Sequence, residues 1–337
     1  MNASASDYCL FVGVDIAAAS FAATWSPAGS PPQRARTFPQ TPEGFAAFQA
    51  ALASTAVPPA QTLIVLEATG SYWITLAVTL HQAGYAVSVV NPAHVHAFGR
   101  SLPRRAKTDA LDAQLLTLFA VERQPSRWTP PEQVYHELRQ RLLVRDGLLT
   151  MRQQARNQGH ALEQWPVTIP AALAALDTVV RECERQLETL ETEIATVLQE
   201  GAWAESAALL GSIKGIGLIT SAWLLVGTLN FTACVSAEAA AAYAGVVPLA
   251  RESGTSVRGR RQIGHAGNAR LRTALYMATL SAARHNPVIR GQYERLRAAG
   301  KPTKVARCAC AHKLLRLAYA VVTKGQAFDP HYGRQSG

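Results

Sequence analysis

Four acidic side chains in the first third of the chain have types and positions suited to binding a metal ion. They are Asp15, Glu67, Asp109 and Asp112. The first two each end a short apolar run typical of a β-strand, where a purely structural strand would not need a charge. The last two lie three positions apart in a segment that reads as a helix start, so they share one face. Carboxylates held this close repel each other unless a cation or a proton lies between them.

The chemistry suited to such a cluster is metal-dependent cleavage of phosphodiesters. A hard divalent cation such as Mg²⁺ takes oxygen ligands and keeps some waters, so carboxylates at a sheet edge and on an adjacent helix make a suitable site. Two ions held there could act on a phosphodiester. Each acid alone is more simply a turn former or a helix cap, above all Asp109, which follows Thr108 at a helix start. Taken together, the four positions favour the metal site.

The elements that must position these acids form an α/β domain with a mixed sheet, because residues 8–128 alternate between strand-like and helix-like segments. Strands are expected at 9–14, 21–25, 36–38, 62–67 and 85–90, and helices near 42–54 and over 72–83. Asn-Pro at 91–92 stops the last strand, and a basic loop over 100–107 leads into the helix of the acid pair. Pro-Pro at 130–131 marks a boundary.

The segment after this boundary is predicted to form two long helices. Apolar residues recur there with alternating spacings of three and four, the pattern of a helix that packs along another helix. They are Leu173, Leu176, Val180, Cys183, Leu187, Leu190, Ile194 and Val197. Residues 132–162 are the expected antiparallel partner, with a loop at 166–170. The spacing fits a hairpin within one chain and a coiled-coil contact between protomers equally well.

A third unit is expected from about residue 203 onward. Residues 213–218 (Ile-Lys-Gly-Ile-Gly-Leu) are similar to a helix-hairpin-helix, in which a glycine turn presents backbone N–H groups to a phosphate. A tight turn between two packed helices needs the same glycines. Residues 243–272 form a polar loop rich in Gly and Arg, which is costly to order without an anionic ligand. Apolar spacing predicts supporting helices over 273–283 and 305–322.

Composition indicates a folded chain with room for several cores. At 337 residues and 48% hydrophobic content, it can hold two domains or more. The N-terminus has no basic segment followed by an apolar stretch, and no later run is long enough to cross a bilayer, so we expect a soluble intracellular protein with no membrane partner. The five cysteines lack CxxC spacing and are odd in number, which indicates neither a zinc site nor a disulfide framework.

Positive charge is concentrated in the C-terminal part. Residues 201–337 carry 18 Lys and Arg against 5 Asp and Glu, whereas residues 1–200 carry 15 against 18. Over 251–316 there are 15 basic residues and only two acidic ones, a bias typical of a face that binds a polyanion. Nucleic-acid contacts are therefore expected. The candidates are Arg104, Arg105, Lys107, Lys214, Arg251, Arg258, Arg260, Arg261, Arg270 and Arg272.

In their order and spacing, these motifs resemble the DEDD-type insertion-sequence transposases, the insertion sequence 110 family, also described as bridge-RNA-guided recombinases. The resemblance covers nearly the full chain. It rests on Gly13-Val-Asp15, Leu66-Glu67-Ala-Thr-Gly70, Lys107-Thr-Asp109-Ala-Leu-Asp112-Ala, Gly215-Ile-Gly217, and Gly245-Val-Val-Pro248 through Ser253-Gly254 to Arg270-Leu-Arg272. No motif is decisive alone, but together they are specific.

The fold that this resemblance implies has three parts. They are an α/β RNase H/RuvC-like N-terminal domain at 1–128, a helical coiled-coil middle segment at 129–200, and a mostly α C-terminal transposase domain with a helix-hairpin-helix-like element at 201–325, followed by a tail at 326–337. In that family the four acids coordinate Mg²⁺, with Mn²⁺ as an alternative, and a serine of the C-terminal domain attacks DNA. The matching positions are Asp15, Glu67, Asp109, Asp112 and Ser253.

Ser253 also has a physical case of its own. A serine hydroxyl is a poor nucleophile unless its proton is removed or the developing charge is stabilised, and Arg251, Arg258, Arg260 and Arg261 could supply the positive field. Ser256 is the rival in the same loop. A serine beside a glycine is by default a turn residue.

The implied activity is site-specific recombination that mobilises an insertion sequence through a covalent phosphoserine link. The implied partners are donor and target DNA, a noncoding bridge RNA that pairs with both, and further copies of the chain in a homodimer or tetramer. The implied location is the prokaryotic cytoplasm, in association with the nucleoid. Abundant Arg and only 7% aromatic residues fit the reading of a nucleic-acid backbone, and they fit plain DNA binding as well.

Three other functions remain in competition at this level. A RuvC-like junction endonuclease would use a metal-activated water and form no covalent link. A sugar kinase or actin-like ATPase also begins with a run like Val12-Gly-Val-Asp15, but the second glycine-rich phosphate loop of that fold is not apparent and the basic C-terminal part is left unexplained. A noncatalytic nucleic-acid scaffold would not need all four acids.

Overall fold

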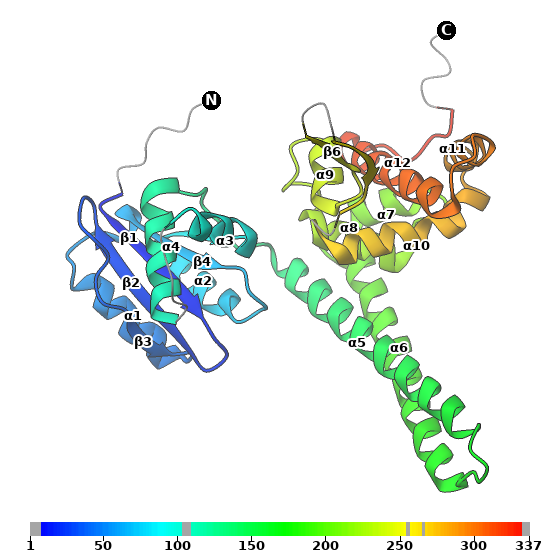
Figure 1. Ribbon diagram of the computed structural model, residues 1–337, viewed down its shortest axis with the longest axis horizontal. Helices are drawn as coiled ribbons and strands as arrows, with labels where there is room; N and C mark the ends of the chain where they lie inside the picture. The colour runs from blue at the N-terminus through cyan, green and yellow to red at the C-terminus, as the bar shows by residue number, and fades with distance from the viewer. Residues whose placement is uncertain (1–7, 103–108, 254–256, 265–266, 332–337) are drawn as a thin grey trace. The chain divides into compact units, whose positions relative to one another are not determined.

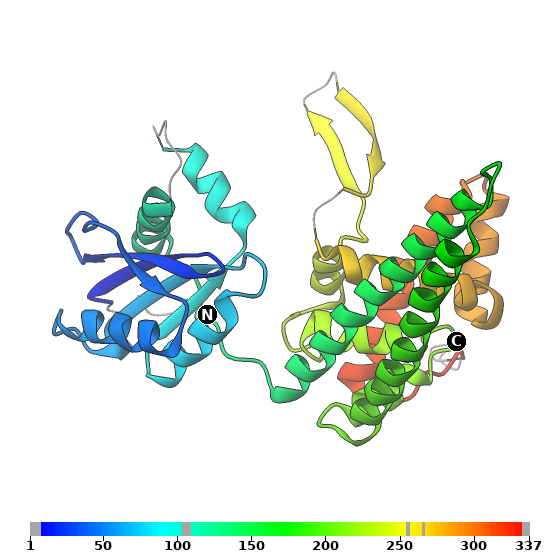
Figure 2. The same cartoon turned by 90° about the horizontal axis from the view of Figure 1, so that it is seen from below.

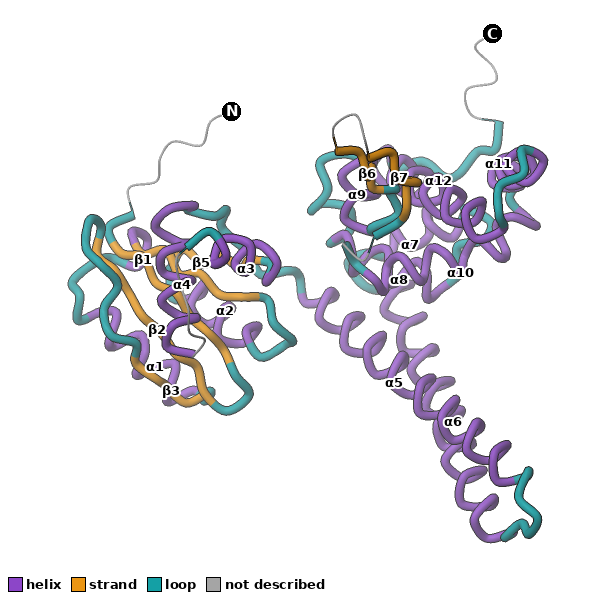
Figure 3. Tube along the Cα trace, in the orientation of Figure 1, coloured by secondary structure: helices purple, strands orange, loops and turns teal. Residues whose placement is uncertain are grey.

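The computed structural model describes residues 8–102, 109–253, 257–264 and 267–331, which form two compact units divided between Pro130 and Pro131. The first unit is an α/β domain (Figures 1 and 3). Its strands are β1 (Leu10–Ile16), β2 (Ser20–Pro27), β3 (Arg36–Pro39), β4 (Thr62–Glu67) and β5 (Ala86–Val90). Its helices are α1 (Pro42–Ala53), the short 3-10 helix η1 (Pro59–Gln61), α2 (Trp73–Gln82), α3 (Pro92–Arg100) and α4 (Asp109–Arg123).

The five strands form one mixed sheet in the order β3-β2-β1-β4-β5. β1 pairs with β2, and β2 with β3, in antiparallel fashion, whereas β1, β4 and β5 run parallel. The predicted α/β fold with a mixed sheet is therefore confirmed. The topology is compatible with a RuvC-like domain.

Helices cover both faces of this sheet and bury two separate cores. On one face, aromatic side chains of α1 pack with Leu76 and Leu80 of α2 against Val12 and Phe21. On the other, Phe98 of α3 and Leu116 of α4 pack with further apolar residues of the parallel strands. The parallel strands are buried on both faces, which is why β4 is a continuous apolar run rather than an alternating one.

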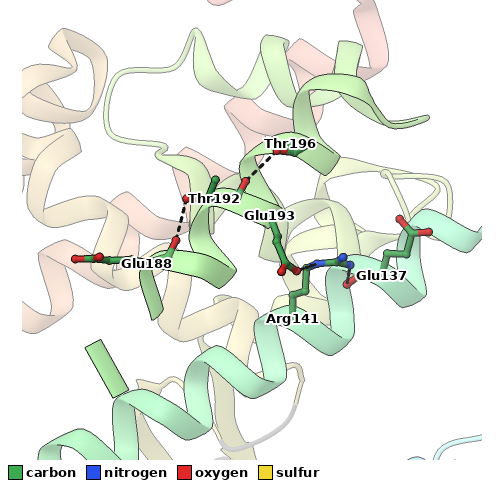
Figure 4. A network of polar contacts seen from close by, with 6 residues as sticks. All are labelled: Glu137, Arg141, Glu188, Thr192, Glu193 and Thr196. Carbon is green, nitrogen blue, oxygen red and sulfur yellow. Dashed lines mark hydrogen bonds and ion pairs between the residues drawn. The ribbon is translucent and has the colours of Figure 1, made fainter. Parts of the chain in front are cut away.

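The second unit begins with two long helices that lie side by side, α5 (Gln133–Leu162) and α6 (Pro170–Glu200) (Figure 1). The apolar stripe predicted for 173–197 lies on the α6 face that packs on α5, with Cys183, Leu187 and Ile194 buried. Arginines of α5 pair with glutamates of α6 along their length. Figure 4 shows one such pair, in which Arg141 donates to Glu193 at 2.7 Å.

The rest of the second unit is a helical body that carries one β-hairpin. The elements are α7 (Ala204–Gly211), α8 (Leu218–Thr228), α9 (Ala237–Ala244), β6 (Leu249–Ser253), β7 (Val257–Gln262), α10 (Ala269–His285), α11 (Pro287–Ala298) and α12 (Thr303–Lys324). The ends of α5 and α6 join its core, so the long helices and the body share one hydrophobic cluster. No helix in the described part of the chain combines the length and apolarity that a membrane crossing requires.

The segment 243–272 was expected to be an irregular loop, but it contains a β-hairpin. β6 and β7 pair antiparallel, with Ser253 opposite Val257, and Figure 2 shows the hairpin standing out from the helices of its unit. Its sequence contains little apolar alternation, so periodicity could not reveal it. Cross-strand pairing supplies hydrogen-bond partners for the backbone groups of the two strands.

Candidate active site

The carboxyl ends of two parallel strands bring the first two acids to one edge of the sheet. β1 and β4 pair in register up to Val14 and Leu66, so Asp15 and Glu67 are the next residues on neighbouring strands. Ligand sites of open α/β sheets lie at this edge. Glu67 is also oriented locally, because the Thr69 hydroxyl donates to its Oε1 at 2.8 Å.

A close contact between α4 and the sheet brings the third acid to the same place. Gly13 lies under α4, where a Cβ atom would overlap the Ala113 carbonyl oxygen and the Thr117 amide nitrogen. The buried Thr117 hydroxyl lies 3.0 Å from the main-chain oxygen of Thr24, which ties the helix to β2. Asp112, directly before this contact, is held beside the strand ends.

Asp15, Glu67 and Asp112 line one open cleft of about 600 Å³, and each is half-buried. His96 and Arg100 of α3 line it as well, and neither was predicted from the sequence as a member of this site. Their spacing of four on the helix that follows Asn91-Pro92 was the available signal, because it puts both on one helical face.

The donor set of this cleft suits a hard divalent cation. All three acids offer carboxylate oxygens, and Mg²⁺ is usually held by one or two carboxylates with several waters retained. Among the described residues, no group of three or more Asp, Glu, His or Cys side chains is arranged to hold a metal ion. Asp109 is the first residue of α4, and its side chain lies outside the described part.

The fit between Gly13 and α4 is testable by stability. We expect Gly13→Ala to lower the free energy of unfolding of the first unit by about 2–3 kcal/mol, because the added methyl meets main-chain atoms that cannot rotate away. Gly147→Ala in α5 is the matched control: nothing lies within 4 Å of the position that its added methyl would take, and alanine should stabilise that helix by about 0.5–1 kcal/mol. Chemical denaturation measures both. Unchanged stability of Gly13→Ala would mean that α4 does not rest on β1.

The predicted nucleophile and its four arginines lie on the β-hairpin. Ser253 ends β6, Arg251 lies on the same strand, and Arg258, Arg260 and Arg261 lie on β7. These placements concern the backbone, because their side chains are outside what the structure describes. Ser256, Arg104, Arg105 and Lys107 fall outside the described residues altogether.

The other basic candidates, Lys214, Arg270 and Arg272, lie on or between helices of the second unit. Arg270 pairs with Asp146 at 2.7 Å and lies over the Trp223 ring, so its charge is already compensated. Arg272 is half-buried on α10. Lys214 is exposed in the turn between α7 and α8, and its carbonyl accepts a hydrogen bond from the Asn286 side chain.

The two glycines of that turn differ in what surrounds them. Gly215 has a φ of +102°, and a Cβ there would lie 2.6 Å from the Ala282 Cα, so its packing against α10 requires glycine. Gly217 is exposed before α8 and has open space around it. The first glycine is therefore explained by helix packing, whereas the second leaves the N-terminus of α8 accessible.

Comparisons with known proteins identify the family of this chain. A family model described as transposase, of the IS110 DEDD type, matches residues 12–163, and a second, described as transposase of the IS116/IS110/IS902 family, matches residues 207–294. The pilin gene-inverting protein of Moraxella bovis is 29% identical over 327 residues, 95% of this chain and 97% of that protein. The transposase for insertion sequence element IS1328 of Yersinia enterocolitica is 28% identical, covering 74% of this chain and 80% of that protein. The chain belongs to the IS110 family of transposases.

Proposed function

We propose that this transposase is a site-specific DNA recombinase, which mobilises an insertion sequence by cutting and rejoining DNA strands through a covalent phosphoserine link. The observation that carries the proposal is the convergence of Asp15, Glu67 and Asp112 on one cleft, in a chain that also presents Ser253 on a basic hairpin. The relatives from Moraxella, which match over nearly their full length, are named for inverting a gene. Inversion requires that cut strands be rejoined.

The cleft is the proposed metal site. A DEDD-type transposase domain implies the use of a divalent metal ion, and Asp15, Glu67 and Asp112, with Asp109 from the start of α4, would hold Mg²⁺ or Mn²⁺. Such an ion, when bound, polarises a phosphoryl oxygen and neutralises developing charge. Arg100, exposed on the wall of the same cleft, would pair with a DNA phosphate and position the strand.

Ser253 is the proposed nucleophile. Its Oγ would form a bond to phosphorus while the bond from phosphorus to one deoxyribose oxygen breaks; the serine proton is lost and the departing oxygen gains one. The phosphoserine link keeps the energy of the broken phosphodiester, so a second deoxyribose hydroxyl can reverse the exchange and rejoin the strands. The arginines at 251, 258, 260 and 261 would stabilise the charge on the phosphoryl group.

Sequence choice and assembly are further parts of the proposal. A noncoding bridge RNA would select donor and target DNA by base pairing, while the protein reads backbone and shape. The accessible N-terminus of α8 after Gly217 would bind a phosphate in the manner of a helix-hairpin-helix. Several strands must be cut together, so the acidic cleft and the serine would act from different protomers of a dimer or tetramer, with α5 and α6 as a coiled-coil contact.

One experiment tests the whole reaction. The protein is purified from cells that carry its flanking DNA, and the bound nucleic acid is sequenced. It is then incubated with donor and target DNA with or without Mg²⁺ and with or without prior RNase treatment. We expect a transcript from the noncoding end of the element, and joined products only when Mg²⁺ and the RNA are both present. Joined products after RNase treatment would remove the guide from the proposal, and joined products in EDTA would remove the metal.

A further inference from the structure

The second unit contains a pocket that the proposed reaction does not use. It has a volume of about 480 Å³, within the range of about 300–1,000 Å³ that small-ligand sites occupy. α5, α8, α9 and the start of α10 enclose it. Three of its lining residues are aromatic: Tyr135, Trp223 and Tyr243.

The aromatic residues give the pocket a wall and a rim. Trp223 is 6% exposed and belongs to the core, whereas Tyr243, which also lines the pocket, is 50% exposed. Tyr135 is half-buried on α5. Burial raises its pKa, so its phenol stays neutral and can both donate and accept a hydrogen bond. A flat, partly exposed ring beside an apolar wall is what a stacked nucleobase needs.

An arginine supplies the polar recognition. Arg139 is half-buried, and its Nη1 donates to the Tyr135 hydroxyl at 2.6 Å. Among the described residues it pairs with no carboxylate, in contrast to Arg270 on the same pocket, which pairs with Asp146. A half-buried guanidinium without a counter-ion favours an anionic or carbonyl-bearing ligand. Such a ligand accepts hydrogen bonds that replace those to water lost on burial.

The pocket lies at the base of the β-hairpin. The segments that lead into and out of the hairpin begin and end at its lining: Tyr243 of α9 precedes β6 by six residues, and Asn268 follows β7 by six. The backbone N–H of Asn268 donates to the Tyr243 carbonyl at 2.8 Å, which joins the two segments at the base of the hairpin. A DNA strand that runs along the hairpin therefore passes this pocket.

We propose that the pocket holds one unpaired nucleotide of the DNA strand, its base stacked on Tyr243 and Arg139 donating a hydrogen bond to it. Exchange of strands requires that paired bases separate. Binding of one base outside the DNA duplex offsets part of the free-energy cost of unstacking it. The inference rests on DNA as the substrate and goes beyond the serine chemistry.

The test is a binding experiment that involves no cleavage. The full-length protein, in a Ser253→Ala background and in EDTA, is titrated with a duplex that carries one bulged 2-aminopurine and with the fully paired duplex. We expect the bulged duplex to bind at least about 5-fold more tightly, since one base stacked on an aromatic ring is worth this much, and the 2-aminopurine fluorescence to fall on binding. Tyr243→Ala should reduce the preference to less than about 2-fold, and Tyr243→Phe should keep it.

Two further variants make the result decisive. Arg139→Gln should weaken binding of the bulged duplex and leave the paired duplex unaffected, which covers the case that Tyr243→Ala folds poorly. Trp165→Ala removes an aromatic ring that is 66% exposed, far from this pocket in the loop between α5 and α6, and should change nothing.

Equal affinities for the two duplexes would overturn the inference, as would a preference that survives Tyr243→Ala. An RNA duplex with the same bulge, bound more tightly than the DNA, would also overturn it, since the occupant would then be RNA. Because no bond is cut in this experiment, its failure leaves the phosphoserine proposal standing, and failure to trap a phosphoserine leaves this result standing.

Discussion

Replacing Ser253 with alanine is expected to abolish the covalent protein–DNA adduct and reduce strand joining by about 10³-fold or more, as loss of a nucleophile does in other covalent enzymes. DNA affinity should remain within about 2-fold of the wild type, because the change removes one small hydroxyl from a hairpin whose arginines remain. The adduct is measured by trapping after denaturation, with labelled donor DNA on a denaturing gel, and affinity by anisotropy.

Ser256→Ala is the matched control, since it removes the rival hydroxyl three residues further along the chain. We expect that variant to keep the adduct. An adduct lost in Ser256→Ala and kept in Ser253→Ala would move the nucleophile by three residues. No trappable adduct in the wild type, together with cleaved DNA, would favour a RuvC-like endonuclease that uses water.

Asp112→Asn is expected to lower strand cleavage by roughly 10²–10³-fold, because a metal ion that stabilises charge in the transition state contributes several kcal/mol and each 1.36 kcal/mol is a factor of ten. The variant should fold as well as the wild type, since it removes one of several like charges from a shared cleft rather than a core contact. Mg²⁺ should raise the melting temperature of the wild type, and this shift should shrink in Asp112→Asn, because a ligand of the native state stabilises it.

Glu122→Gln provides the control for this experiment. Glu122 is exposed on the same helix and does not line the cleft, so its loss should leave cleavage and the Mg²⁺ shift unchanged. Wild-type cleavage by Asp112→Asn would remove this acid from the metal site. A melting temperature that falls as far as that of Gly13→Ala would show that Asp112 holds α4 in place instead of holding an ion.

Local pattern was a good guide to the elements of this protein. The apolar runs before Asp15 and Glu67 predicted β1 and β4 within a residue or two, and the alternating spacing in 173–197 predicted the face of α6 that packs on α5. These succeed because a buried strand and a packed helix repeat their apolar residues at fixed intervals. The same approach did not reveal the β6–β7 hairpin. That hairpin stands out from the helices and is held by backbone pairing, which leaves no apolar repeat in the sequence.

The sequence by itself determined the kinds of residue available: four acids at element ends, a serine among arginines, and a basic C-terminal part. Only the tertiary structure decided which of them share a space. Parallel pairing put Asp15 beside Glu67, the missing side chain of Gly13 let α4 bring Asp112 to them, and α3 added His96 and Arg100. It also enclosed the pocket of Tyr135, Arg139 and Tyr243 from segments about a hundred residues apart. Periodicity reports which face of an element is buried, whereas a site depends on how distant elements pack, and that packing is set by the whole core.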